Sequence, residues 1–482
     1  MNESRRNAGG ARRSRQSRAG RVSRNLYIWM GIGMQTMAPC AGELTLEYPR
    51  PYTLVQRESA GGGVIPVRGR FPSDQRPSRV EARFAGGPWQ VVDAQPGSNT
   101  FAGNLPAPVG QGRLEVRTAG PAAATAGVEC VAVGDLFLVA GQSNADGRGA
   151  EWVRLDPANP YVGVKYRRGE WSPGGDPSAN DTTNAHESAS PWPIVLNQII
   201  PSQKVPVGFI AAAVGSTVVR QWRRVDGACA AKAWSPGGMY ARAREMVETA
   251  TGGRPKIRAV LYYQGENDMT HWNGLSVMGD YAAYKSNLLA MVDSFWEDYQ
   301  VPVLVGQLSN NGADREKNDA VRRAQQEIWR EHPHALPGAV TYDIYPTDGC
   351  HFRDPARMKA LAERWVAAIL SGVYGRTEYA GPELKSLRRT GPRTLALTYQ
   401  HPMVLGSWDG RSGTKAEGFR LADSAGVLVP CALAATRIEG GSVTLDFDRE
   451  LPPGLRVHCG SGADGQDGVV LRHAANGLPA PM

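Results

Sequence analysis

The stretch at 134–149, GDLFLVAGQSNADGRG, constrains the fold of this chain most. Five apolar residues, 136–140, run without interruption and stop at a small polar turn that holds Gly141 and Ser143. A short apolar run bounded by glycine is typical of a buried strand in a parallel sheet. Residues just beyond the carboxyl end of such a strand face the crevice where α/β proteins bind ligands. The sequence therefore predicts that Ser143 lies at a ligand-binding edge.

Ser143 has two interpretations when its turn is considered alone. Serine is a good N-cap for a following helix, and a Gly-x-Ser-Asn turn suits that role. A serine hydroxyl acts as a nucleophile when a base, a group that orients the base and donors for an oxyanion surround it. The turn is not the G-x-S-x-G elbow of α/β-hydrolases, because Asn144 and Ala145 follow the serine. The choice between a cap and a nucleophile depends on residues elsewhere in the chain.

Two later polar turns supply the groups that a nucleophilic serine needs. Residues 260–268, VLYYQGEND, predict a second strand that ends in a turn, where the Asn267 amide can donate to an oxyanion. Residues 345–352, YPTDGCHF, place Asp348 three residues before His351. At this spacing the carboxylate can accept from the imidazole Nδ1–H while Nε2 points toward a nucleophile. These turns favour the nucleophile interpretation of Ser143.

With these residues, the chain resembles the SGNH hydrolases, and more closely their sialate O-acetylesterase and carbohydrate esterase family six branch. The resemblance covers about residues 43–482 and is most specific between 134 and 352. Its motifs are GQSN at 141–144, VGFI and GST at 207–210 and 215–217 with Trp222, YQGEN at 263–267, and DGCH at 348–351. It implies an α/β fold with an SGNH, flavodoxin-like, three-layer domain around a parallel sheet.

The resemblance also implies a role for each matching residue. Ser143 would be the nucleophile, His351 the base and acid, and Asp348 the residue that orients His351. The oxyanion hole would consist of the Ser143 and Gly215 backbone N–H groups and the Asn267 side chain. Position 216 is Ser where the branch often has a second Gly. Four further residues are expected to contact substrate: Gln142, Gln264, Glu266 and Trp222.

The pattern of short strands and turns predicts four segments. They are a basic tail with a signal peptide at 1–42, a β-sandwich-like domain at 43–127, an SGNH esterase domain at 128–375 and a β-rich domain at 376–482. In the esterase domain we expect strands at 136–140, 207–213, 259–263, 303–307 and 340–344. We expect helices at 193–200, 239–250, 281–299, 319–331 and 355–370. Residues 152–191 are expected to be a structureless wall of the site, with Trp152, Trp171 and Trp192 as candidate sugar platforms.

The net charge of +8 is concentrated at the amino terminus. Residues 1–25 hold eight Arg and one Glu, so this tail carries +7 and the remainder +1. The body of the chain has no basic excess of the kind that phosphate binding requires, so we expect no nucleic-acid partner. The tail precedes an apolar run at 26–38, which predicts an exported protein, periplasmic or extracellular. A disordered basic tail on a cytoplasmic protein is the alternative.

That apolar run has thirteen residues, which is too short to span a bilayer, so we expect no stable membrane insertion. Together with these residues, the resemblance implies a serine esterase that removes O-acetyl groups from carbohydrate through an acyl-enzyme, without a metal or organic cofactor. Its partner would be an acetylated glycan or sugar. The alternative is a non-catalytic carbohydrate-binding protein on an SGNH scaffold, which a long separation of Ser143 and His351 would favour. A paired-carboxylate glycosidase would leave Ser143, Asn267 and the Asp348–His351 pair without a role.

Overall fold

The computed structural model describes residues 43–72, 74–75, 77–120, 123–178, 188–270, 274–309, 315–423, 427–458 and 468–480. The chain from residue 42 onward forms one compact unit. The expected tail and signal peptide at 1–42 lie outside the described residues.

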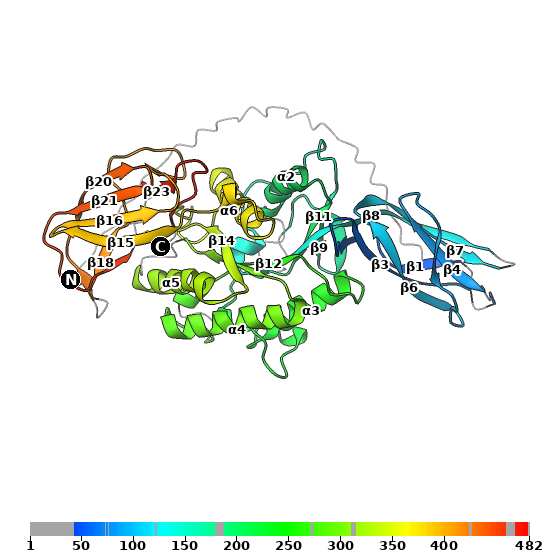
Figure 1. Cartoon of the computed structure of the whole chain (residues 1–482). Coiled ribbons are helices and arrows are strands. Elements are labelled where there is room, and N and C mark those ends of the chain that lie inside the picture. The colour runs from blue at the N-terminus through cyan, green and yellow to red at the C-terminus, as the bar shows by residue number, and fades with distance from the viewer. Residues whose placement is uncertain are drawn as a thin grey trace, which may run out of the picture. The chain divides into compact units, whose positions relative to one another are not determined.

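A mostly parallel sheet forms the centre of this unit (Figure 1). Its strands follow the order β10-β9-β11-β8-β12-β13-β14, and all neighbours are parallel except β10 and β9. The strands β8, β11, β12, β13 and β14 are in spatial order 2-1-3-4-5 when numbered along the chain, which is the flavodoxin-like order. Their bounds are β8 Thr125–Gly141, β9 Gly163–Arg167, β10 Glu170–Pro173, β11 Val207–Ala211, β12 Ala259–Tyr263, β13 Val303–Gln307 and β14 Ala335–Val340.

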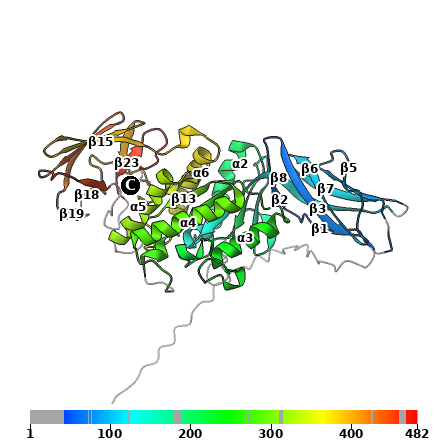
Figure 2. The ribbon, with the colours of Figure 1, turned by 60° about the horizontal axis from the view of Figure 1, so that its bottom comes forward.

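Helices cover both faces of the sheet, which explains why every residue of β11, β12 and β13 is buried. α2 (Trp192–Gln203) and α6 (Pro355–Gly372) lie on one face. α3 (Gly238–Ala250), α4 (Tyr281–Tyr299) and α5 (Arg315–Glu331) lie on the other and come forward in Figure 2. The α/β three-layer arrangement is therefore confirmed.

The strand β8 continues beyond the central sheet. Its first half pairs antiparallel with β7 (Gly110–Ala119), and its middle pairs with β2 (Leu54–Gln56). Its last residues pair with β11 and β12, and the chain then enters the one-turn helix α1 (Ser143–Asp146). The topology reverses between β11 and β12, so Ser143 follows the strand at the switch point, where open α/β sheets bind ligands.

The regions on either side of the central domain are β-rich. The first contains β1 (Thr45–Tyr48), β3 (Gly62–Arg70) and β6 (Thr100–Pro108) in one sheet, while β4 (Arg79–Phe84) and β5 (Gln90–Asp93) extend β7. The second holds three small sheets of the strands β15 Leu384–Gly391, β16 Thr394–Tyr399, β17 Met403–Gly406, β18 Arg420–Ala422, β19 Leu428–Val429, β20 Leu433–Glu439, β21 Ser442–Phe447, β22 Arg456–His458 and β23 Val470–His473. Sandwich packing and the domain boundaries stay predictions.

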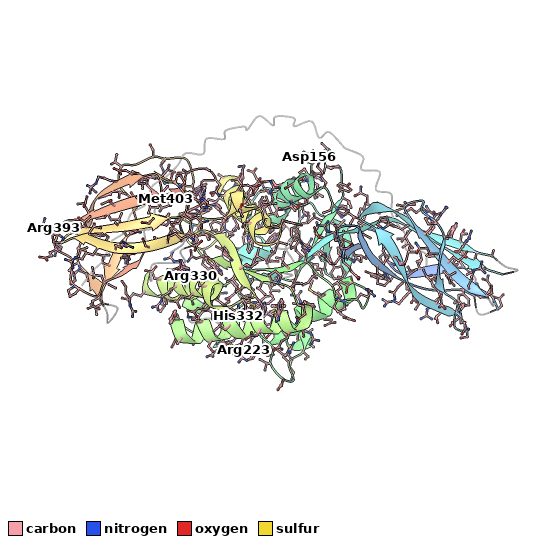
Figure 3. The ribbon with its side chains drawn as sticks, viewed as in Figure 1. Asp156, Arg223, Arg330, His332, Arg393 and Met403 are labelled. Atoms are coloured by element: carbon pink, nitrogen blue, oxygen red, sulfur yellow. The ribbon has the colours of Figure 1, made fainter. Side chains whose placement is uncertain are left out.

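Two expectations about the central domain are wrong. The last strand is β14 at Ala335–Val340, whereas residues 341–344 form a turn closed by the Ile344 N–H and the Thr341 carbonyl at 3.0 Å. β14 includes Pro337, which is tolerated because β14 is the edge strand of the sheet. The segment 152–191 is not structureless, because β9 and β10 form a hairpin within it. Asp156 of this segment lies beside α2 (Figure 3), where the Asn197 side chain accepts its N–H.

Asp135 lies on β8 between the two halves of that strand and has no exposed surface. Its carboxylate accepts two hydrogen bonds from Arg57 and one from the Tyr374 hydroxyl, each at 2.8 Å. Asp135→Ala leaves that guanidinium and hydroxyl without their acceptor, so we expect a loss of about 3–5 kcal/mol in the free energy of unfolding. Denaturant unfolding measures it. The control Arg70→Ala removes an exposed ion pair with Glu47 and should cost less than about 1 kcal/mol; equal losses would contradict the prediction.

Candidate active site

The turn after β8 brings Ser143 against the end of β12. The Gln142 N–H donates to the Tyr263 carbonyl at 3.0 Å. Gly141 has a φ of 123°, and a Cβ at this position would lie 2.1 Å from the same carbonyl oxygen, so only glycine fits. Ser143 then begins α1 and is 4% exposed. The close approach of the two backbones determines where the serine lies.

His351 lies between Ser143 and Asp348. Its Nε2 is 3.1 Å from the Ser143 Oγ, and its Nδ1 is 3.1 Å from the Asp348 Oδ2. The other oxygen of Asp348 accepts from the backbone N–H groups of His351, at 2.7 Å, and Cys350, at 3.0 Å. The carboxylate therefore orients both the imidazole and the turn that carries it. A serine, an imidazole and a carboxylate in this order can move a proton from the hydroxyl to Nε2.

Burial and the charges around His351 together favour its neutral form. Its pKa is lowered from the ordinary value, chiefly because burial penalises the charged imidazolium; Asp348 offsets part of this effect, and the positive charges of Arg148 and Arg353 add to it. Burial acts to raise the pKa of Asp348, but hydrogen bonds from Arg353 and His351 outweigh it and hold the pKa well below its usual range. An ionised carboxylate beside a neutral imidazole is the state that a general base requires.

Of the three expected oxyanion donors, the Ser143 N–H belongs to the nucleophile turn, and the other two come from turns that contact it. The Val214 N–H donates to the Gly141 carbonyl at 3.0 Å, which brings the following Gly215 to the nucleophile turn. The Asn267 N–H donates to the Gln142 Oε1 at 3.3 Å. Among the described residues, none accepts a hydrogen bond from the Ser143 N–H, the Gly215 N–H or the Asn267 side chain. These groups are thus available to a ligand, and their role as an oxyanion hole stays a prediction.

Buried polar side chains connect these turns. Gln142 Oε1 accepts from the Gln264 side chain and the Gly265 N–H, both at 3.2 Å, besides Asn267. Gln264 also donates to Asp268 at 2.7 Å, and Asp268 accepts from the Val219 N–H at 2.8 Å. Burial raises the pKa of Asp268 to about 6, against the lowering effect of these hydrogen bonds. The network joins the Ser143, Gly215 and Asn267 turns.

The four residues expected to contact substrate lie in the interior. Gln142, Gln264, Glu266 and Trp222 are at most 2% exposed. Trp222 donates from Nε1 to the Thr217 hydroxyl at 3.0 Å, and burial raises the pKa of Glu266 to about 7. Substrate contact by these side chains stays a prediction; the structure places all four among other protein groups.

Three residues that surround the site have no role predicted from the sequence. Asn144 bonds to both neighbours of His351, Arg353 donates from Nε to Asp348 at 2.5 Å, and Arg148 donates to Asp146 at 2.8 Å. Asn144 could have been found, because it belongs to the GQSN motif. The two arginines stand outside the motifs, and only the folded chain brings their charges to His351.

Among the described residues, no group of three or more His, Cys, Asp and Glu side chains is placed to hold a metal ion. In the same part of the chain, no helix has the length and apolar character needed to cross a membrane.

The chain is similar to known proteins in sequence and in fold. Residues 133–371 match the sequence profile of the family described as carbohydrate esterase, sialic acid-specific acetylesterase. A carbohydrate acetylesterase from Xanthomonas citri is similar in structure, with a TM-score of 0.60, 19% identity, and coverage of 91% of this chain and 98% of that one. An Arabidopsis thaliana protein, at a TM-score of 0.39 and 19% identity, and NanS, at 0.36 and 16%, each cover 50% of this chain and 98% of their own. No curated protein matches the chain significantly.

The flavodoxin-like strand order and a serine, histidine and aspartate placed at the switch point define an SGNH hydrolase. Residues 133–371 belong to the sialic acid-specific acetylesterase family of carbohydrate esterases, and the protein is a carbohydrate O-acetylesterase.

The lowered pKa of His351 predicts the pH dependence of this esterase. A general base must be neutral, so we expect kcat/KM to fall as the pH drops through an apparent pKa below the ordinary 6.5 and to level off above it. Arg353→Gln removes a positive charge near the imidazole, so the fall in kcat/KM should move to higher pH. Initial rates with 4-nitrophenyl acetate from pH 4.5 to 8.5 measure it. The control Arg70→Gln, in the first β-rich region, should leave the apparent pKa of kcat/KM unchanged. An unchanged apparent pKa in Arg353→Gln would contradict the prediction.

Proposed function

We propose that this esterase removes O-acetyl groups from glycans by nucleophilic catalysis, with Ser143 as the nucleophile. The observation that carries the proposal is the pair of 3.1 Å contacts that join the Ser143 Oγ, the His351 imidazole and the Asp348 carboxylate. In the first step His351 Nε2 takes the hydroxyl proton while Oγ attacks the acetyl carbonyl carbon. The negative charge that develops on the carbonyl oxygen is stabilised by the N–H groups of Ser143 and Gly215 and by the Asn267 side chain.

The second half of the reaction uses the same groups. The tetrahedral intermediate collapses, the bond to the sugar oxygen breaks, and His351 Nε2 gives its proton to the departing alkoxide. An acetyl ester of Ser143 remains. Water then loses a proton to His351 and attacks this ester, and collapse of the second intermediate releases acetate and returns the proton to Ser143. Asp348 stabilises the imidazolium in both halves.

A binding protein without turnover is the other function that the sequence allows. It would be favoured if Ser143 and His351 were too far apart to share a proton. The separation of 3.1 Å lies within hydrogen-bonding distance, so the geometry favours catalysis.

Two exposed tryptophans support a glycan as the substrate. Trp152 and Trp234 are 49% and 52% exposed, whereas Trp192, another candidate platform, is 3% exposed. Trp152 lies two residues after Ala150, whose N–H donates to the Arg353 carbonyl at 2.9 Å beside the His351 turn. The Trp234 carbonyl accepts from the Gln221 side chain at 2.9 Å, just beyond the Gly215 turn. Exposed indole faces at the border of a polar site suit the apolar C–H faces of sugars.

Export from the cytoplasm is also part of the proposal. It rests on the basic residues and apolar run of 1–42, which lie outside the described residues. Amino-terminal sequencing of the mature protein tests it, because export by a cleaved signal peptide removes this segment. A mature chain that keeps the arginines would contradict export by that route.

The nucleophile assignment is tested by acetate release. We expect the wild type to release acetate from at least one of 4-nitrophenyl acetate, acetylated xylan and 9-O-acetyl sialic acid. Ser143→Ala should lower kcat about 10⁴-fold or more, because the covalent step is lost. The control Ser371→Ala changes a serine on α6 whose hydroxyl donates to the Ala367 and Ala368 carbonyls of the same helix, and it should keep wild-type rates. Release by Ser143→Ala at the wild-type rate would overturn the assignment.

The tryptophan platforms make a prediction about KM. Trp152→Ala and Trp234→Ala should each raise KM for a polymeric acetylated glycan about 3- to 10-fold, the value of one aromatic contact. They should leave KM for 4-nitrophenyl acetate unchanged, since that ester needs no sugar contact. Val404→Ala, at a side chain that is 43% exposed in the second β-rich region, serves as the control. If both tryptophan variants have the wild-type KM for the glycan, the prediction that Trp152 and Trp234 contact the sugar is wrong.

A further inference from the structure

The Asn144 side chain joins the nucleophile turn to the histidine turn. Its Nδ2 donates to the Cys350 carbonyl at 2.9 Å, and its Oδ1 accepts from the Phe352 N–H at 3.3 Å. Cys350 and Phe352 are the two neighbours of His351 in the chain. One amide, directly after Ser143, therefore binds the backbone on both sides of the base.

The same amide reaches the turn that carries Asn267. The Asn144 Nδ2 donates a second hydrogen bond to the Glu266 Oε1 at 2.7 Å. Glu266 immediately precedes Asn267 and is 2% exposed, and Asn144 is 3% exposed. A carboxyl oxygen accepts this bond whether the group is ionised or neutral. The buried pair thus connects the base and the oxyanion donor through the residue that follows the nucleophile.

The histidine turn needs such a support, because no helix or strand contains it. Residues 345–353 form turns between β14 and α6, and the side chains of His351 and Asp348 are 21% and 35% exposed. Proton transfer from Ser143 requires the imidazole to stay within about half an ångström of its position. The Asp348 carboxylate orients the ring but comes from the same turn, so it cannot hold that turn against Ser143.

We propose that Asn144 and Glu266 form a clamp that holds the His351 turn and the Asn267 turn against Ser143, and that both act as positioning residues for the esterase. The inference rests on the proposed function, because it assumes that Ser143 and His351 do the chemistry. Neither clamp residue touches the reacting atoms; Asn144 acts through the backbone beside His351, and Glu266 acts through Asn144 and the adjoining Asn267.

Exchange of donor and acceptor within the clamp tests the proposal. Asn144→Asp keeps the shape of the side chain but loses both amide donors and sets two carboxyl groups against each other. We expect kcat for 4-nitrophenyl acetate to fall about 100-fold, with KM within about 2-fold, because the base is misplaced while the ester still binds. Glu266→Gln keeps an acceptor oxygen for Asn144, so its loss of kcat should be smaller.

The double variant Asn144→Asp/Glu266→Gln restores a hydrogen bond between positions 144 and 266. Its direction is reversed, because the amide at 266 donates to the carboxylate at 144. We expect it to recover about 10-fold in kcat over Asn144→Asp. The rate at which a fluorophosphonate labels Ser143 should follow kcat, because it reports the same activated hydroxyl. Asn287→Asp makes the same chemical change on α4, where the Asn287 oxygen accepts from Arg223 at 2.8 Å, and should keep the wild-type kcat.

The full chain is used throughout, and thermal unfolding of each variant shows that it is folded. A folded double variant that is no faster than Asn144→Asp would overturn the clamp. A fall in unfolding temperature with an unchanged kcat would also overturn it, since the pair would then serve stability alone. If Asn144→Asp does not fold, Glu266→Ala should lower kcat more than Glu266→Gln, and equal rates would refute the clamp. Activity that survives Ser143→Ala would refute the proposed function instead.

Discussion

The pairing of β8 with strands of both the first β-rich region and the central domain is the constraint on which the fold and the site depend. The strand begins beside β7 in the first β-rich region and ends between β11 and β12 in the central sheet. Asp135 lies where β8 passes from the first β-rich region into the central sheet. Its carboxylate accepts hydrogen bonds from Arg57, which precedes β8 in the chain, and from Tyr374, which follows the central domain's last helix. Because neighbouring strands pair with β8 along its length, the turn that follows Gly141 has little freedom. The strand therefore determines the position of Ser143.

Beyond β8, amide and carboxyl side chains replace regular structure as the means of positioning. The turns that carry Gly215, Asn267 and His351 are bound to the Ser143 turn by Gln142, Gln264, Asp268, Asn144 and Glu266, all at most 3% exposed. Burying carboxyl groups is costly, and the cost is visible in the pKa values of Glu266, about 7, and Asp268, about 6, both raised by burial. The hydrogen bonds that they accept offset part of this cost and make the arrangement rigid.

The sequence predicts the parts of the fold that local patterns encode. The apolar runs of β11, β12 and β13 and the helices α3, α4 and α6 lie where periodicity places them. The last strand was expected at 340–344 but lies at Ala335–Val340, and its position at the sheet edge makes Pro337 acceptable within it. The 3.1 Å contacts of His351 agree with the spacing of Asp348 and His351. The charges of Arg148 and Arg353 near that imidazole were not predictable, because Arg148 belongs to another turn and neither arginine lies within a motif.

Position 216 shows that hydrogen bonds, and not glycine, determine the shape of the Gly215 turn. Ser216 has a φ of 63°, a left-handed conformation that costs a non-glycine residue about 1–2 kcal/mol, where the resembling branch often has Gly. The Thr217 hydroxyl donates to the Val214 carbonyl at 3.0 Å, and the Val214 N–H donates to the Gly141 carbonyl at 3.0 Å. These bonds attach both ends of the turn to one another and to the end of β8. Ser216 is therefore held in an unfavourable backbone conformation, and the Gly215 turn stays bound to the end of β8.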